Sequence, residues 1–130
     1  MPDISVAIRS LEHAIATVPQ RPQSSRWRAM VANRVHGLRE AYLLELEHGP
    51  ASEAFAFDAP WICGRMQLLH RDQVRIVEEL EALARACVEA MDLDVLRAQV
   101  QLALQRIARL RQRENDLVYE SVDLDLGGEQ

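Results

Sequence analysis

A chain of 130 residues with a formal net charge of −5 at pH 7 has the size of one ordinary domain, which leaves little room for a second. Acidic residues outnumber arginines 20 to 15 and lysine is absent, which argues against a nucleic-acid-binding protein, because such a protein needs a basic surface to displace counterions. The sequence has no apolar run of the roughly 18 residues that a membrane span needs, and its N-terminus lacks the pattern of a signal peptide. We therefore expect a cytoplasmic protein with no membrane partner.

Apolar residues recur at helical spacing along the whole chain, and no segment alternates as a strand does. The first helix is predicted over residues 3–18. One apolar stripe runs along it, formed by Ile4, Ile8, Leu11, Ile15 and Val18. The segment PQRPQSS ends this helix, because proline removes a hydrogen-bond donor and disfavours helix in the residue before it.

The second and third helices have recognisable ends. The second is predicted over residues 25–48, where a serine caps the start and Gly49-Pro50 stops the helix. The third is predicted over residues 59–90, with Pro60 in its first turn, where a missing N–H costs nothing. Each of these helices carries an apolar face, as expected of helices that pack in a bundle.

The fourth helix is predicted over residues 93–120, after a break in which Asp92 is the cap. Its apolar seam repeats at steps of three and four residues through Leu93, Leu96, Val100, Ala103, Ile107, Leu110, Glu114 and Leu117. Residues 121–130 are predicted to be a frayed tail. Four amphipathic helices with short connections predict an all-α, up-down-up-down antiparallel four-helix bundle that forms one domain over residues 1–130.

Bundles of this kind can hold a metal ion through His and Glu side chains that project inward. On a helical wheel His13 and His36 point away from the apolar faces, and the second of these pairs with Glu40 at a spacing typical of a weak surface contact. His48 suits the negative end of a helix dipole. His70, on the flank of the third seam, is the histidine that could face the core, either as a ligand or as a partly buried, hydrogen-bonded side chain.

Two carboxylates lie close to apolar faces, Glu45 on the second helix and Glu114 on the fourth. A carboxylate that points inward must be paired, protonated or bound to a metal. Glu114 has Arg111 and Arg113 nearby as possible partners. The sequence contains no glycine-rich phosphate loop, no catalytic triad motif and no paired cysteines for zinc, so an enzyme has little support.

Three stretches carry a family resemblance: EHGP at the end of the second helix, PWICGRMQLLH at the start of the third, and RLRQRENDLVYESVDLDLGGEQ at the end of the fourth. They resemble the bacterial hemerythrin-like (HHE cation-binding) family, especially its actinobacterial members. The resemblance is loose over most of the chain and close at the C-terminal end. It implies a four-helix bundle that binds one or two non-haem irons through inward His and Asp or Glu, for oxygen, nitric oxide or peroxide chemistry or sensing.

Carried over residue by residue, the histidine of the family's third helix corresponds to His70, and that of the fourth helix to Leu110. The resemblance thus implies that leucine has replaced a ligand, and a buried leucine stabilises a metal-free core by roughly 1.5–3 kcal/mol. The family's second-helix histidine falls near Tyr42 or Leu43. The remaining candidate metal ligands are His70, Glu45, Glu47, Glu114 and Asp116.

The predicted function is that of a hemerythrin-like bundle with a degraded metal site and no cofactor, which binds a partner or a small apolar ligand in a non-enzymatic, regulatory or interaction role. One alternative is a non-haem iron protein with a rearranged ligand set, which binds oxygen or nitric oxide or decomposes peroxide. A second alternative is a homodimeric structural bundle, because the first helix is roughly 16 Å too short to cover the last two.

Four large apolar side chains gather around the loop into the third helix, namely Phe55, Phe57, Trp61 and Ile62. Large aromatic side chains are usually buried, which favours a lid over the end of the bundle. The alternative is a surface on which a protein partner or a second subunit docks.

Overall fold

The computed structural model describes residues 3–16, 24–48, 60–89 and 92–128, with side chains described over 3–16, 25–47, 64–89 and 92–120. These ranges contain four helices and no strand: α1 (Ile4–Ala16), α2 (Ser24–His48), α3 (Pro60–Val88) and α4 (Leu93–Gly128). The all-α prediction is therefore confirmed for this part of the chain. Phe55 and Phe57 fall outside the described residues, and of Trp61 and Ile62 only the helical backbone falls within them.

The predicted ends of the first three helices agree with the structure to within two residues, but the predicted end of the fourth is wrong. The segment 121–128, expected to fray, continues α4 as helix to Gly128. No glycine or proline interrupts this helix before Gly127, so its backbone hydrogen bonds can continue. The N-terminus of α4 is capped as expected, since the Asp94 N–H donates to Asp92 Oδ1 over 3.3 Å.

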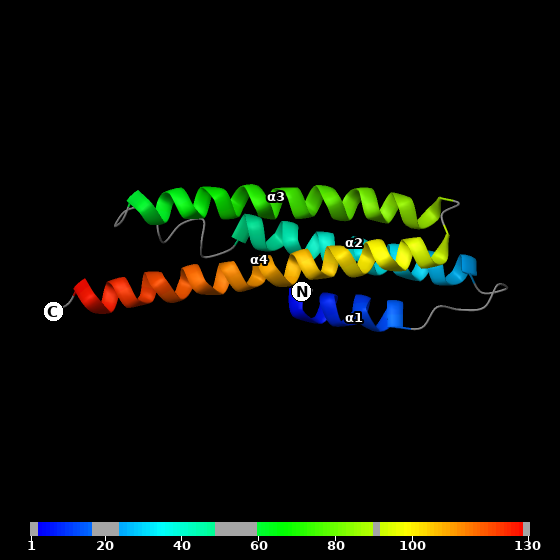
Figure 1. Cartoon of the computed structure of the whole chain (residues 1–130), viewed down its shortest axis with the longest axis horizontal. Coiled ribbons are helices and arrows are strands. Elements are labelled where there is room, and N and C mark those ends of the chain that lie inside the picture. The colour runs from blue at the N-terminus through cyan, green and yellow to red at the C-terminus, as the bar shows by residue number, and fades with distance from the viewer. Residues whose placement is uncertain (1–2, 17–23, 49–59, 90–91, 129–130) are drawn as a thin grey trace.

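The helices pack side by side along the long axis of the molecule (Figure 1). Helix α2 contacts α1 and α3, helix α4 contacts α3, and α1 and α4 contact each other less extensively. The N-terminal part of α3 and the C-terminal part of α4 extend past the beginning of α1 (Figure 1). None of the described helices has a stretch sufficiently long and apolar to traverse a lipid bilayer.

The core follows the apolar seams that the sequence predicts. Helix α4 buries Leu96, Val100, Ala103, Ile107 and Leu110, which recur at the steps of three and four expected of a helix in a bundle, and Leu117 follows seven residues later. Leu110 is only 1% exposed, so it packs as a core residue. Buried residues from α1, α2 and α3 belong to the same cluster, which makes one continuous core.

Helix α1 is held by side chains from its two neighbours. The buried indole Nε1 of Trp27, on α2, donates to the carbonyl oxygen of Ala14 over 2.9 Å. The guanidinium Nε of Arg97, on α4, donates to the carbonyl oxygen of Ile15 over 2.8 Å. Carbonyls in the last turn of a helix have no partner within it, so these two bonds cap α1 and fasten it to the bundle.

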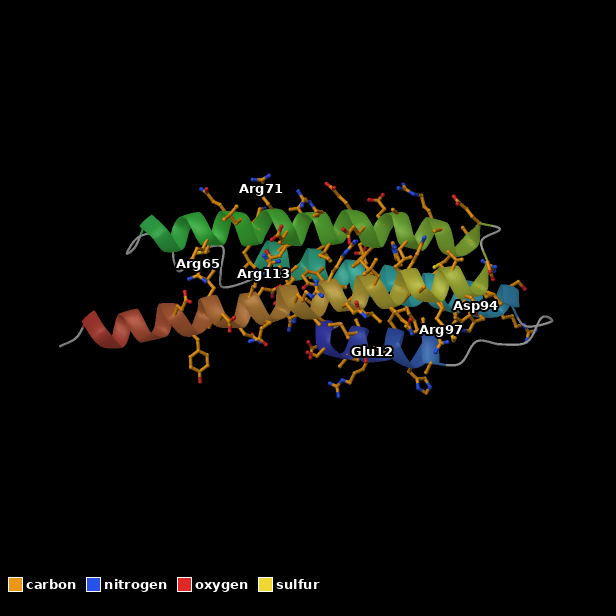
Figure 2. The ribbon with its side chains drawn as sticks, viewed as in Figure 1. Glu12, Arg65, Arg71, Asp94, Arg97 and Arg113 are labelled. Atoms are coloured by element: carbon orange, nitrogen blue, oxygen red, sulfur yellow. The ribbon has the colours of Figure 1, made fainter. Side chains whose placement is uncertain are left out.

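Three ion pairs join α3 to α4: Arg65 with Glu120, Asp72 with Arg113 at 2.7 Å, and Glu79 with Arg106 at 3.1 Å. The α3 partners rise in steps of seven residues while the α4 partners fall in steps of seven. This spacing is that of charges flanking the seam of an antiparallel helix pair, and it fixes which residues of the two helices face each other. Arg65 and Arg113 lie between the two helices in Figure 2.

Candidate functional site

A carboxylate occupies one position of the apolar seam of α4. Glu114 lies between the buried residues Leu110 and Leu117, and its side chain is only 13% exposed. Tyr42, a fully buried residue of α2, donates its hydroxyl to Glu114 Oε1 over 3.1 Å. A buried carboxylate needs such a partner, because its desolvation would otherwise cost several kcal/mol.

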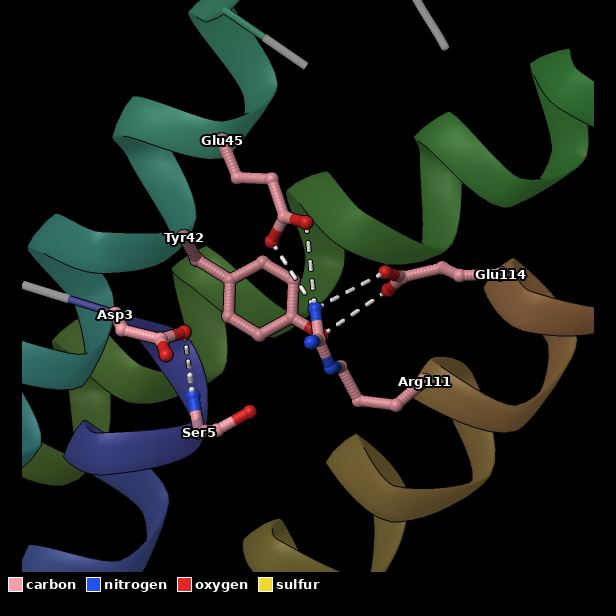
Figure 3. A network of polar contacts seen from close by, with 6 residues as sticks. All are labelled: Asp3, Ser5, Tyr42, Glu45, Arg111 and Glu114. Carbon is pink, nitrogen blue, oxygen red and sulfur yellow. Dashed lines mark hydrogen bonds and ion pairs between the residues drawn. The ribbon is translucent and has the colours of Figure 1, made fainter. Parts of the chain in front are cut away.

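Arg111, one turn before Glu114, bridges α4 to α2. Its Nη1 lies 3.3 Å and 3.2 Å from the two carboxylate oxygens of Glu45 and 3.4 Å from Glu114 Oε2. Figure 3 shows the guanidinium between the two carboxylates, next to the hydroxyl of Tyr42. We call Tyr42, Glu45, Arg111 and Glu114 the polar cluster.

The polar cluster shifts the pKa of three of its members. Burial raises the pKa of Glu114 above its ordinary value, although the Arg111 charge and hydrogen bonds from Tyr42 and Gln73 oppose this. Burial raises the pKa of Tyr42 as well, and the charge of Glu114 adds to it. For Arg111, burial acts to lower the pKa, but the attraction of Glu45 and Glu114 outweighs it and the pKa is raised.

These shifts decide what the polar cluster can do chemically. Tyr42 stays a neutral hydrogen-bond donor throughout the physiological range, so it is no base, and Arg111 stays a cation. A permanent cation between two carboxylates neutralises charge within the bundle, as a metal ion would. The contacts of the cluster join α2 to α4.

The candidate metal ligands are only partly brought together. Glu45 and Glu114 meet, but on either side of Arg111. Glu47 and Asp116 are exposed, and Asp116 Oδ1 accepts a hydrogen bond from Gln112 on its own helix. Among the described side chains, no group of three or more His, Cys, Asp or Glu is placed to hold a metal ion.

The histidines lie outside the core wherever their side chains are described. His70 is exposed, so it does not face the core as it could have done, because the neighbouring Leu69 takes the inward direction on α3. His13 and His36 are exposed as expected, and His36 Nε2 lies 3.7 Å from Glu40 Oε1. The residues present thus do not fit the non-haem iron that the family resemblance implies, since its imidazole ligands have no inward counterpart in this part of the chain.

Sequence reasoning found the two inward carboxylates but missed the link between them. It placed Arg111 near Glu114, without indicating that the same guanidinium reaches Glu45 on another helix. A signal was present in Tyr42, because a tyrosine on an apolar face needs a partner for its hydroxyl, and Glu114 interrupts the facing seam.

No protein-family model, curated protein or solved structure matches the chain.

Proposed function

We propose that the chain is a hemerythrin-like, up-down-up-down four-helix bundle whose metal position has been taken over by protein contacts, and that it acts as a non-enzymatic binding or interaction protein. The observation that carries this proposal is the Arg111 guanidinium, within 3.4 Å of both inward carboxylates. The buried Leu110, where the resemblance expects a histidine, supports it further. The course of the chain in Figure 1, where each helix begins on the side of the molecule toward which the previous one runs, supports the topology.

The magnitude of the electrostatic effect favours exclusion of a metal. A divalent cation held by both carboxylates would lie about 5 Å from the guanidinium, and their repulsion is on the order of 6 kcal/mol at an effective dielectric constant of about 20. Loss of the carboxylate contacts of Arg111 would add to this cost. The two carboxylates of Glu45 and Glu114 are therefore better placed to bind the Arg111 guanidinium than a metal ion.

The test is iron retention after anaerobic incubation with ferrous iron and desalting. We expect the wild-type protein to retain far less than one iron per chain and to show no charge-transfer band in the near ultraviolet. Arg111→Met should retain more iron than the wild type, whereas Arg113→Met, which removes an exposed arginine bound to Asp72, should not. Stoichiometric iron in the wild-type protein would contradict the proposal. Equal iron retention in the two variants would show that the guanidinium is not what keeps cations out.

A second candidate function is that of a homodimeric bundle, favoured by the difference in helix lengths. Helix α1 has 13 residues and α4 has 36, so they span roughly 20 Å and 54 Å at 1.5 Å per residue. Leu68, in the N-terminal third of α3, and Tyr119, in the C-terminal third of α4, are 59% and 75% exposed. These parts of the two helices extend past α1 (Figure 1). A second copy of the chain that packs on these extensions would cover both side chains.

Sedimentation at tens of micromolar tests this candidate. We expect a dimer for the wild-type protein and a shift toward monomer for Tyr119→Ala. Val95→Ala, which truncates an exposed residue at the other end of α4, should leave the dimer unchanged. A wild-type monomer at this concentration would eliminate the homodimer.

A further inference from the structure

A groove between α3 and α4 collects positive charge on an otherwise acidic protein. Its volume is about 400 Å³, and the buried residues Ile76 and Leu110 are among those that line it. Four arginines and two carboxylates line it, which leaves a net charge of +2 there, against −5 for the whole chain. We call this site the arginine groove.

Two of its four arginines are paired. Arg113 Nη1 lies 2.7 Å from Asp72 Oδ2, and Arg106 Nη1 lies 3.1 Å from Glu79 Oε2. These contacts are two of the three ion pairs that join α3 to α4, so both carboxylates of the groove already have an arginine partner. They also hold the two helices in a fixed alignment around the groove.

The other two arginines are Arg75, on α3, and Arg109, on α4. Both are exposed, and neither guanidinium forms an ion pair or a hydrogen bond with another described residue. Two unpaired guanidiniums that line one small groove repel each other, and an anion between them would relieve this repulsion. Because they come from different helices, they can approach one anion from two sides.

We propose that the arginine groove binds a small phosphate-bearing anion, with Arg75 and Arg109 as its main ligands. A guanidinium presents a planar fork of N–H donors that matches two phosphate oxygens, and it keeps its charge at every physiological pH. The volume lies at the lower end of the range for small-molecule sites, which suits pyrophosphate or a small phosphate ester. The site is independent of the polar cluster and goes beyond the proposed function.

Titration calorimetry tests the proposal with three probes: inorganic phosphate, pyrophosphate and glycerol 3-phosphate. We expect saturable binding of pyrophosphate at one site per chain, with weaker binding of inorganic phosphate. Glycerol 3-phosphate distinguishes an organic from an inorganic phosphate as the ligand. If it binds more tightly than inorganic phosphate, the ligand is an organic phosphate, and if it binds more weakly, the ligand is inorganic. Arg75→Gln and Arg109→Gln should each lower pyrophosphate affinity at least about tenfold.

Arg71→Gln is the matched control. Arg71 is an exposed arginine of α3, one turn before Arg75, and its side chain points away from α4 (Figure 2). This variant changes the net charge as Arg75→Gln does but leaves the groove intact, so its affinity should stay within about twofold of the wild type. Circular dichroism should show the same helical fold in the wild type and in all three variants. Pyrophosphate should raise the melting temperature of the wild type and of Arg71→Gln only, which separates loss of the site from loss of the fold.

Two outcomes would overturn the proposal. One is the absence of saturable pyrophosphate binding to the wild-type protein at concentrations up to about 1 mM, which corresponds to a binding free energy of about −4 kcal/mol. The other is an equal loss of affinity in Arg71→Gln and Arg75→Gln, which would indicate diffuse attraction to surface charge and no defined site.

Discussion

Replacement of Tyr42 by phenylalanine removes one oxygen atom from the polar cluster and leaves the ring in place. Tyr42 is fully buried, and its hydroxyl donates to Glu114 Oε1 over 3.1 Å. Because phenylalanine has the same shape, no cavity forms, and the loss is that of the hydrogen bond and of a partner for a buried carboxylate. A hydrogen bond to a charged group contributes about 1.5–3 kcal/mol, and Glu114 keeps Arg111 as a partner, so we expect the lower end, about 1.5 kcal/mol.

Urea unfolding followed by circular dichroism measures this loss. With a slope of about 1–3 kcal/mol per molar urea, a loss of about 1.5 kcal/mol moves the midpoint by roughly 0.5–1.5 M. Tyr119→Phe is the control, because the same chemical change there falls on an exposed side chain and should alter the free energy of unfolding by less than about 0.5 kcal/mol. If the two variants unfold at the same urea concentration, the hydroxyl of Tyr42 does not stabilise the fold.

Three further predictions concern pH, packing and thiol reactivity. Burial raises the pKa of Glu114, so the contribution of its protonated form to stability is fully present below the ordinary pKa of 4.5 and is lost as pH rises through the raised pKa. Glu114→Gln should remove this decline, which is measured as the pH dependence of the urea midpoint relative to the wild type. Leu110→Ala should lower the free energy of unfolding by about 2–5 kcal/mol, whereas Leu102→Ala, on an exposed side chain, should cost less than about 1 kcal/mol. Cys87 is fully buried, and burial raises its pKa to about 11. In a Cys63→Ser background, the native protein should therefore react slowly with a thiol reagent at pH 8 and rapidly in urea, and fast reaction of the native protein would contradict the burial of Cys87.

Much of the fold is predictable from the sequence because each helix carries its own periodicity and its own stop signals. The seam of α4 at steps of three and four residues predicts the buried face from Leu96 to Leu117. The end of α4 was missed because an acidic C-terminal segment resembles a frayed tail, although no proline or glycine precedes Gly127. Composition favoured fraying there, whereas the absence of a helix breaker decided the structure.

The candidate site is less predictable, since it depends on how the helices are aligned with one another. Periodicity places Glu45 and Glu114 inward, but only the alignment of α2 with α4 brings Arg111 between them. His70 illustrates a second difficulty, because successive helical residues differ by about 100° in direction, so an error of one residue exchanges a core position for a surface position. The first difficulty concerns a pair of helices, which periodicity describes one at a time, and the second concerns the exact phase of a single helix.

The ion pairs between α3 and α4 carry a sequence of signs that permits one alignment of the two helices. If α4 slid by one heptad in one direction, Arg65 would face Arg113, and in the other direction Asp72 would face Glu120. Either displacement replaces three attractive ion pairs by one attractive and one repulsive pair. It also moves the apolar side chains of each helix out of the positions in which they pack against the other. The charges therefore disfavour sliding of α3 along α4, whereas rotation, bending or the release of α1 would leave this pattern of signs intact.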